Sequence, residues 1–99
     1  NMNAIMSEPQ FTLGQVVATH GAAEALDGDL GLVLGLLDRH SRKDWGDVCA
    51  EDALANEEAL IIGARLLSAY DGIGPQRVTL WIITECDRSA TTVLLPCEY

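Results

Sequence analysis

The sequence has few positive charges: six Lys and Arg residues stand against fifteen Asp and Glu residues, which gives a net charge of −9. Proteins that bind nucleic acid do so with clustered Lys and Arg side chains that neutralise phosphates. The cluster of bases here is small and comprises Arg39, Arg42 and Lys43. We therefore expect no direct binding of nucleic acid. The acidic balance suits a solvated surface that keeps the protein soluble, basic protein partners, or imitation of the charge of a nucleic acid.

Cysteine and histidine are also scarce, with three and two residues. Cys49, Cys86 and Cys97 form no C-x-x-C pair, and together with His20 and His40 they match no zinc-binding spacing. The sequence also contains no glycine-rich phosphate-binding motif. We predict no metal and no other cofactor, and we expect the odd number of thiols to stay reduced.

Long apolar runs are missing as well. The longest apolar block, residues 30–37, is far shorter than the ~20 residues that a membrane span needs. The first dozen residues lack the basic start and the apolar run of about 7–15 residues that mark a signal peptide. We therefore expect a cytoplasmic protein with no membrane contact.

The composition that remains is that of a folded domain. The chain is 48% hydrophobic and 21% charged, which favours a globular protein over a disordered one. Ninety-nine residues are too few for two independent cores. We predict a flexible lead-in over residues 1–10 and a single α+β domain over residues 11–99.

The first part of the chain predicts a short strand followed by helices. β-Branched residues favour the strand over 15–19, and Thr19 is a suitable cap for a short helix that ends near Leu26. Apolar residues then recur at the i, i+3, i+4 and i+7 positions, with Asp29 as N-cap. This pattern predicts a second helix over 30–40.

Two further features of the helical region predict local structure. Gly31 and Gly35 in the second helix predict close packing against a neighbouring element. A third helix is predicted over 48–64 after a cap at Asp47. At 100° per residue its apolar face is formed by Ala50, Ala53, Leu54, Leu60, Ile61 and Ala64.

The C-terminal third predicts three strands joined by short turns. They cover 65–70, 77–85 and 91–95, and the short connections predict an antiparallel meander. The central and last strands are apolar on both faces, so helices on one face leave the other in need of a cover. We expect the segment 11–19 or a second subunit to supply that cover.

Glu57 is the sharpest local anomaly, because it falls in the middle of the apolar face of the third helix. A carboxylate there needs a hydrogen-bond or ion-pair partner. Arg65 and Arg88 are the predicted partners, so the three residues form a candidate polar cluster. Such a cluster is either structural or, in a small hydrolase or transferase, catalytic.

Two more residues are candidates for interaction. Trp45 lies in the motif D-W-G-D beside the basic residues, and an aromatic side chain flanked by charges is typical of binding hot spots. The alternative is that its ring packs against the sheet. Asp87 belongs with Arg88 to the turn D-R-S between the last two strands, which carries whatever specificity that hairpin has.

These motifs make the chain resemble a family of small bacterial proteins carried on plasmids and integrating elements, often labelled plasmid-related protein or type I restriction endonuclease subunit M. The resemblance spans roughly residues 13–99 and rests on D-W-G-D, A-N-E, W-I-I-T-E, D-R-S and T-T-V-L-L-P. Cys86 and Cys97 depart from the pattern, which speaks against a role for either thiol. The resemblance implies carriage on a mobile element and an accessory role, and it transfers no catalytic residue.

Three functions follow as hypotheses. The first is a non-enzymatic protein-binding accessory of a mobile element, homodimeric through an apolar sheet face. The second is an acidic inhibitor of restriction or CRISPR machinery that mimics the charge of DNA, since six acids and no base lie between Asp44 and Glu58. The third is the small hydrolase or transferase with Glu57, Arg65 and Arg88. A methyltransferase subunit is excluded, because its doubly wound cofactor-binding sheet does not fit in this chain.

Overall fold

The computed structural model describes residues 8–99 and has the predicted α+β architecture. Residues 1–7 of the predicted lead-in lie outside the described part. The elements in chain order are β1 (Gln15–Ala18), α1 (His20–Leu26), α2 (Leu30–Ser41), α3 (Ala50–Ile62), β2 (Leu66–Ile73), β3 (Val78–Thr84), β4 (Ala90–Leu94) and the short 3-10 helix η2 (Pro96–Glu98).

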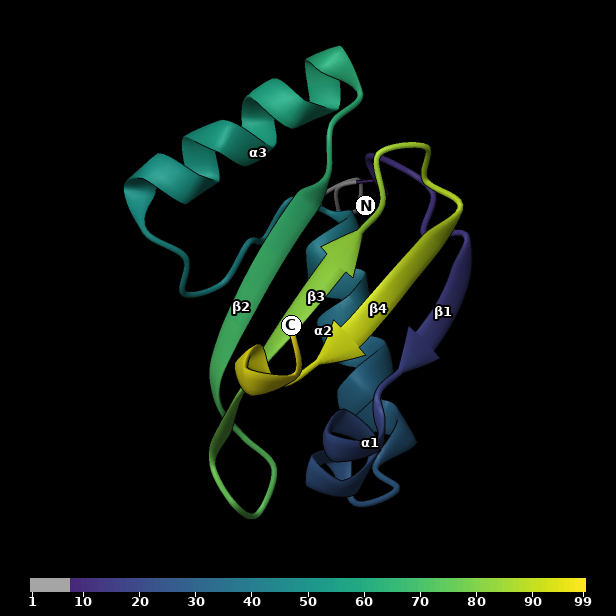
Figure 1. Cartoon of the computed structure of the whole chain (residues 1–99), viewed down its shortest axis with the longest axis vertical. Coiled ribbons are helices and arrows are strands. Elements are labelled where there is room, and N and C mark those ends of the chain that lie inside the picture. The colour runs from purple at the N-terminus through teal and green to yellow at the C-terminus, as the bar shows by residue number, and fades with distance from the viewer. Residues whose placement is uncertain (1–7) are drawn as a thin grey trace, which may run out of the picture.

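The four strands form one mixed sheet in the order β1-β4-β3-β2. Strands β2, β3 and β4 are the predicted antiparallel meander, and β1 joins β4 in parallel as an outer strand. Figure 1 shows α2 behind the sheet and α1 at the lower end of the sheet, next to the ends of β1 and β4, whereas α3 lies to one side, next to the edge strand β2. One face of the sheet is therefore covered by helices, and the other face has no long helix over it. The two edges also differ, because α3 lies next to β2 whereas β1 forms the other edge (Figure 1).

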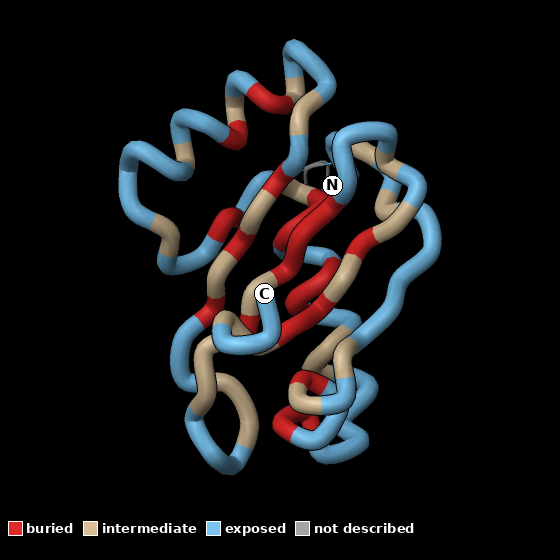
Figure 2. Tube along the Cα trace, in the orientation of Figure 1, coloured by how far each residue is buried: buried red, intermediate tan, exposed pale blue. Residues whose placement is uncertain are grey.

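The core lies between the sheet and the helices α1 and α2. Alternate strand residues point to this side, as expected from the two-residue period of a strand, and they meet the apolar stripe of α2. Figure 2 shows this arrangement as buried segments along β3 and β4 and an exposed β1. The buried members of the cluster are Ala22, Leu26, Leu36, Leu37, Tyr70, Leu80, Ile82 and Val93.

The opposite face of the sheet is covered by the C-terminal segment. The ring of Trp81 on β3 lies 5.7 Å from the ring of Tyr99 in an edge-on arrangement. Ile83 and Leu94 on the same face keep only 4% and 5% of their surface exposed. The prediction that residues 11–19 cover this face is wrong, because they include the edge strand β1.

The outer edge of β2 is closed by a side chain of α3. The amide nitrogen Nδ2 of Asn56 donates to the backbone oxygen of Leu67 at 2.7 Å, and the Leu67 N–H donates to Asn56 Oδ1 at 3.0 Å. A primary amide thus pairs with the strand as a neighbouring strand would. Asn56 is 4% exposed. Its two hydrogen bonds therefore satisfy the N–H and the carbonyl of Leu67 at the place where α3 packs beside β2.

The D-W-G-D segment closes the next part of the same edge. The N–H of Ala69 donates to the Trp45 carbonyl at 3.1 Å, and the N–H of Asp47 donates to the Ala69 carbonyl at 2.6 Å. The Asp47 carboxylate then accepts the N–H of Asp71 at 2.9 Å. Three successive outward-facing residues of β2 are therefore paired within the chain, and this edge offers no site for a further strand.

These contacts correct the prediction for the third helix. Asp47 is occupied at the sheet edge, and α3 instead begins after Cys49 as N-cap. The buried residues of α3 are Asn56 and Ala59, whereas Leu54 and Ile61 are 63% and 84% exposed. The predicted apolar face is therefore correct only in part. Ala53, Leu60 and Ala64 pack against the cluster of Trp45, Ala59 and Leu66, whereas Leu54 and Ile61 are turned outward because the polar anchor Asn56 also lies on the side that meets the sheet.

The second helix begins as predicted but packs differently. The side chain of Asp29 accepts the N–H of Leu32 at 3.0 Å, which confirms the N-cap. A methyl group added at Gly35 would meet nothing within 4 Å, so the predicted close packing at Gly31 and Gly35 is wrong. No helix within residues 8–99 is long and apolar enough to cross a membrane.

The Asn56 anchor makes a testable prediction about stability. Asn56→Ala removes both partners of the Leu67 backbone and should lower the free energy of unfolding by about 2 kcal/mol, measured by urea denaturation. Leu54→Ala on the same helix serves as control, because Leu54 is 63% exposed and its loss should change stability by less than about 0.5 kcal/mol. Equal effects of the two substitutions would contradict the anchoring role.

Candidate functional site

Glu57 has partners, but they are not the predicted ones. Its carboxylate accepts a hydrogen bond from the indole nitrogen Nε1 of Trp45 at 2.9 Å and lies 3.1 Å from Nζ of Lys43. The Trp45 hydrogen bond, followed by Lys43, holds the pKa of the Glu57 carboxyl below its usual value. The predicted pairing with Arg65 or Arg88 is wrong, because both arginines bind elsewhere.

Trp45 is buried, with 6% of its surface exposed, so the predicted exposed recognition patch is wrong and the packing alternative is right. Its ring stacks on Phe11 with centroids 6.3 Å apart and meets the ring of His40 edge-on at 5.8 Å. The indole N–H reaches out of this cluster to Glu57. Trp45 therefore joins α2, α3 and the sheet edge, which is a structural role.

Arg88 joins the turn between β3 and β4 to the end of α3. Its guanidinium donates to the carbonyl oxygens of Ala64 at 2.6 Å and Ala59 at 3.2 Å. These bonds satisfy carbonyls at the C-terminus of the helix, where a positive charge is favourable. Asp87 is exposed, and its carboxylate accepts the N–H of Ser89 at 3.0 Å. This bond lies within the turn, so the role of Asp87 is to shape the turn.

Arg65 lies apart from both Glu57 and Arg88. Its guanidinium donates to the hydroxyl oxygen of Tyr99 and sits 5.1 Å from the centroid of the Tyr99 ring. This contact holds the C-terminal residue over the sheet. Glu57, Arg65 and Arg88 therefore occupy three separate places, and no polar cluster of these residues exists for acid–base chemistry.

A buried polar chain that the sequence did not predict runs through His40. The residue is fully buried, and its ring nitrogens lie 2.5 Å from Ser68 Oγ and 2.9 Å from Thr84 Oγ1. Thr84 Oγ1 is in turn 2.7 Å from Thr91 Oγ1, which donates to the carbonyl of Leu13 at 2.7 Å. The chain links α2, three strands and the segment before β1.

The direction of this chain follows from its last bond. Because Thr91 donates its only hydroxyl proton to a carbonyl, Thr84 must donate to Thr91 and accept from His40 Nε2–H. Burial lowers the pKa of the ring and keeps it neutral, so its single proton is on Nε2 and its Nδ1 accepts from the Ser68 hydroxyl. Burial, and secondly the charge of Arg88, lower the pKa of His40 to about 4.

The amino-acid sequence indicates this hydrogen-bond network only in part. Ser68, Thr84 and Thr91 all occupy strand positions that face the helices, but this becomes apparent only when the register is known. In the sequence, His40 indicates only a potential metal ligand. Within residues 8–99, no three His, Cys, Asp or Glu side chains gather in a way that could hold a metal ion, and Cys49, Cys86 and Cys97 are all exposed and unpaired.

A groove at the C-terminal end of α3 is the candidate functional site. It has a volume of about 510 Å³ and an open mouth. Ala55, Glu58, Ala59, Ile61, Ile62, Ala64 and Arg65 line it. Ile61 and Ile62 are 84% and 75% exposed, although both are large and apolar.

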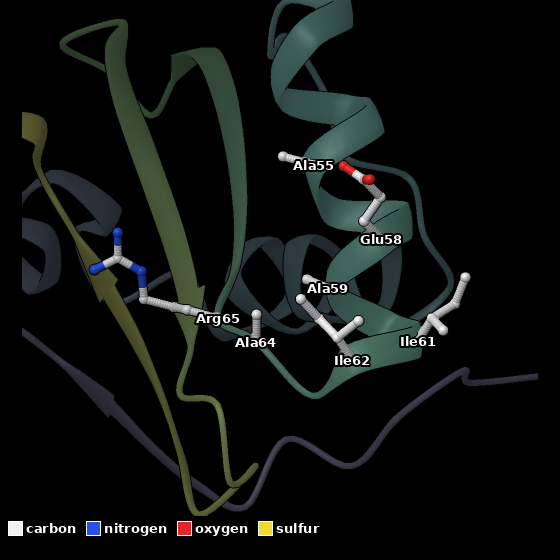
Figure 3. Close-up of a pocket in the computed structure, with 7 residues that line it drawn as sticks. All are labelled: Ala55, Glu58, Ala59, Ile61, Ile62, Ala64 and Arg65. Atoms are coloured by element: carbon white, nitrogen blue, oxygen red, sulfur yellow. The ribbon is translucent and has the colours of Figure 1, made fainter.

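The shape of the groove follows from how α3 is held. Asn56 and the carbonyl contacts of Arg88 fix the helix beside β2, and the chain turns at Gly63, in the left-handed conformation with φ of 75°, to enter the strand. Figure 3 shows Ala55, Ala59 and Ile62 on the side of α3 that faces the strands, with Arg65 extending away across the sheet. Small alanine side chains on the inner wall leave room for another chain.

The chemistry of the groove is that of a contact surface. Its lining is mostly aliphatic, and its two charged side chains, Glu58 and Arg65, are both solvent-exposed. The lining contains no Ser, Thr, Cys or Lys side chain that could act as a nucleophile. The groove is suited to an apolar side of a polypeptide.

No protein-family model, curated protein or solved structure matches this chain.

The buried imidazole predicts how stability depends on pH. The pKa of His40 is about 4 in the folded protein and about 6.5 in the unfolded chain, so the unfolded state binds a proton first as pH falls. The free energy of unfolding should therefore decrease from pH 6.5 to pH 5, with about 1.5 kcal/mol of the decrease due to His40.

The measurement is urea denaturation at several pH values in that interval. His40→Gln should be less stable than the parent and should lack this part of the slope, whereas His20→Gln, which alters an exposed histidine, should retain it. A slope that His40→Gln leaves unchanged would show that the imidazole is not held neutral.

Proposed function

We propose that this protein is a non-enzymatic protein-binding module whose partner docks in the α3 groove. The observation that carries the proposal is the pair Ile61 and Ile62, which are 84% and 75% exposed beside a groove of about 510 Å³. Single exposed apolar residues are common on protein surfaces, but a contiguous apolar patch marks a site of interaction.

The charge of α3 indicates the chemistry of the partner. The helix contains Glu51, Asp52, Glu57 and Glu58 and no Lys or Arg. Glu57 is neutralised by Lys43, but Glu51, Asp52 and Glu58 are exposed. The proposed partner is therefore a protein segment with an apolar side that enters the groove and basic residues that flank it. Complementary charges of this kind increase the rate and specificity of association.

The alternative of a DNA-mimicking inhibitor is less well supported by the geometry. Of the six acids between positions 44 and 58, Asp44 pairs with Arg39, Asp47 binds the β2 edge and Glu57 binds Lys43. Half of the acidic run is thus used within the molecule. The hydrolase or transferase alternative lacks support because its three residues are apart.

The setting that we propose is the bacterial cytoplasm, where the protein would be an accessory of a plasmid or integrating element. The support for this setting is the sequence resemblance over roughly residues 13–99, together with the reduced-thiol composition. The motifs of that resemblance now have structural reasons: D-W-G-D and A-N-E hold α3 against β2. They position the groove, and of their residues Ala55 also lines it.

A substitution in the groove tests the proposal. Ile62→Glu places a charge where the apolar partner surface should lie, while the high exposure of Ile62 should leave the fold intact. The parent chain, immobilised in lysate from the host cell, should retain a partner that the variant loses. The partner is then purified and titrated by calorimetry, and its dissociation constant should rise by about tenfold or more for Ile62→Glu.

Leu54→Glu is the matched control. It introduces the same charge into the same helix at an exposed apolar residue that does not line the groove, so binding should change little. Binding to the parent should also weaken as salt is added, because the partner's flanks are basic. A partner whose affinity is equal for the parent and Ile62→Glu would refute docking in the groove.

A further inference from the structure

The β1 edge of the sheet is open, in contrast to the β2 edge, whose backbone groups are hydrogen-bonded within the chain. β1 forms this edge, and all four of its residues are exposed (Figure 2). The N–H of Gln15 donates to the carbonyl of Ser89, just before β4, and the N–H of Thr19 donates to the carbonyl of Val93 in β4. In a parallel ladder alternate residues bind the neighbouring strand. The backbone groups of Val16 and Ala18 therefore face outward, and among residues 8–99 no further strand lies beyond them.

Nothing in β1 discourages pairing with another strand. Proteins usually protect an edge with a charged side chain, a proline, a bulge or a covering segment. The sequence Gln-Val-Val-Ala contains no charge and no proline, and its register with β4 is regular. The same protein closes β2 with Asn56 and with the Trp45–Asp47 segment, so the open state of β1 is specific to that edge.

We propose that β1 is a dimerisation edge on which a second copy of the chain adds its own β1 in antiparallel orientation. The outward residues define a self-complementary register, with Val16 opposite Ala18 of the second copy and Val17 opposite the same residue on the two-fold axis. An isologous interface needs this kind of self-complementary surface. The two sheets then form one continuous sheet of eight strands.

Charge favours this surface for a second copy. Each chain carries a net charge of −9, so two copies repel each other over most of their surface. The segment from Gln15 to Thr19 carries no charge, which makes it a place where two such chains can approach.

Apolar surface next to β1 adds to the backbone pairing. Val16 and Val17 are 43% and 42% exposed, and Leu30 and Leu34 of α2 are 66% and 55% exposed. A second pocket, of about 220 Å³, connects the two elements, because Ala18, Leu30 and Val33 line it together. This surface lies on α2 and β1, so the dimer is independent of the α3 groove and either proposal can fail alone.

The test uses charge at the two-fold axis and sedimentation equilibrium of the purified chain. The parent should sediment with twice the chain mass at high concentration. Val17→Lys and Val17→Glu each place like charges directly opposite one another, so each variant alone should dimerise at least about tenfold more weakly than the parent. An equimolar mixture of the two variants should regain dimers, since opposite charges then face each other.

Each outcome of the sedimentation experiment either supports or overturns the proposed dimer. Regained dimers in the mixture also show that both variants fold, and they would establish the Val17 register. A parent chain that remains monomeric at the highest soluble concentration would overturn the proposal, and so would variants that dimerise as strongly as the parent. Leu54→Glu on α3 is the control and should leave the dimer mass unchanged, and a loss of dimers in that variant would place the interface on α3 instead.

Discussion

The hydrogen bonds between the Asn56 side chain and the Leu67 backbone are the constraint on which the arrangement depends. They place α3 beside the sheet instead of over it, and they close one edge of the sheet with a helix side chain. Ala53, Ala59 and Leu60 of α3 pack on the same side as this polar anchor, whereas Leu54, Ile61 and Ile62 stay exposed for other contacts. The groove and the exposed Ile61 and Ile62 are consequences of that attachment.

Regular elements could be predicted from the sequence, because periodicity and caps are local signals. The meander, the helix after Asp29 and the short strand before Thr19 all follow from such signals. The partners of Glu57 and the network of His40 could not be predicted, since side-chain bonds between distant elements leave no period in the sequence. The inward face of α3 could be predicted only in part for the same reason: Ala53, Leu60 and Ala64 pack inward as their spacing indicates, but the buried amide of Asn56 has no such signal.

The interior of the molecule stabilises the fold, whereas its surface carries the two candidate binding regions. Inside, His40 and its hydroxyl partners connect helix and strands through a chain in which every polar group has a partner, and within residues 8–99 no buried side-chain nitrogen or oxygen lacks a hydrogen bond. Outside, large apolar residues gather in two regions, one on α3 and one on β1 with α2. We propose the first as the partner site and the second as the surface for a second copy.

Hydrogen exchange of single backbone amides tests the unequal treatment of the two sheet edges most directly. In a dilute, monomeric sample we predict slow exchange at Leu67 and Ala69, whose N–H groups are bonded on the closed edge, and fast exchange at Val16 and Ala18 on the open edge. Similar protection at all four amides, or faster exchange at Leu67 than at Val16, would contradict it.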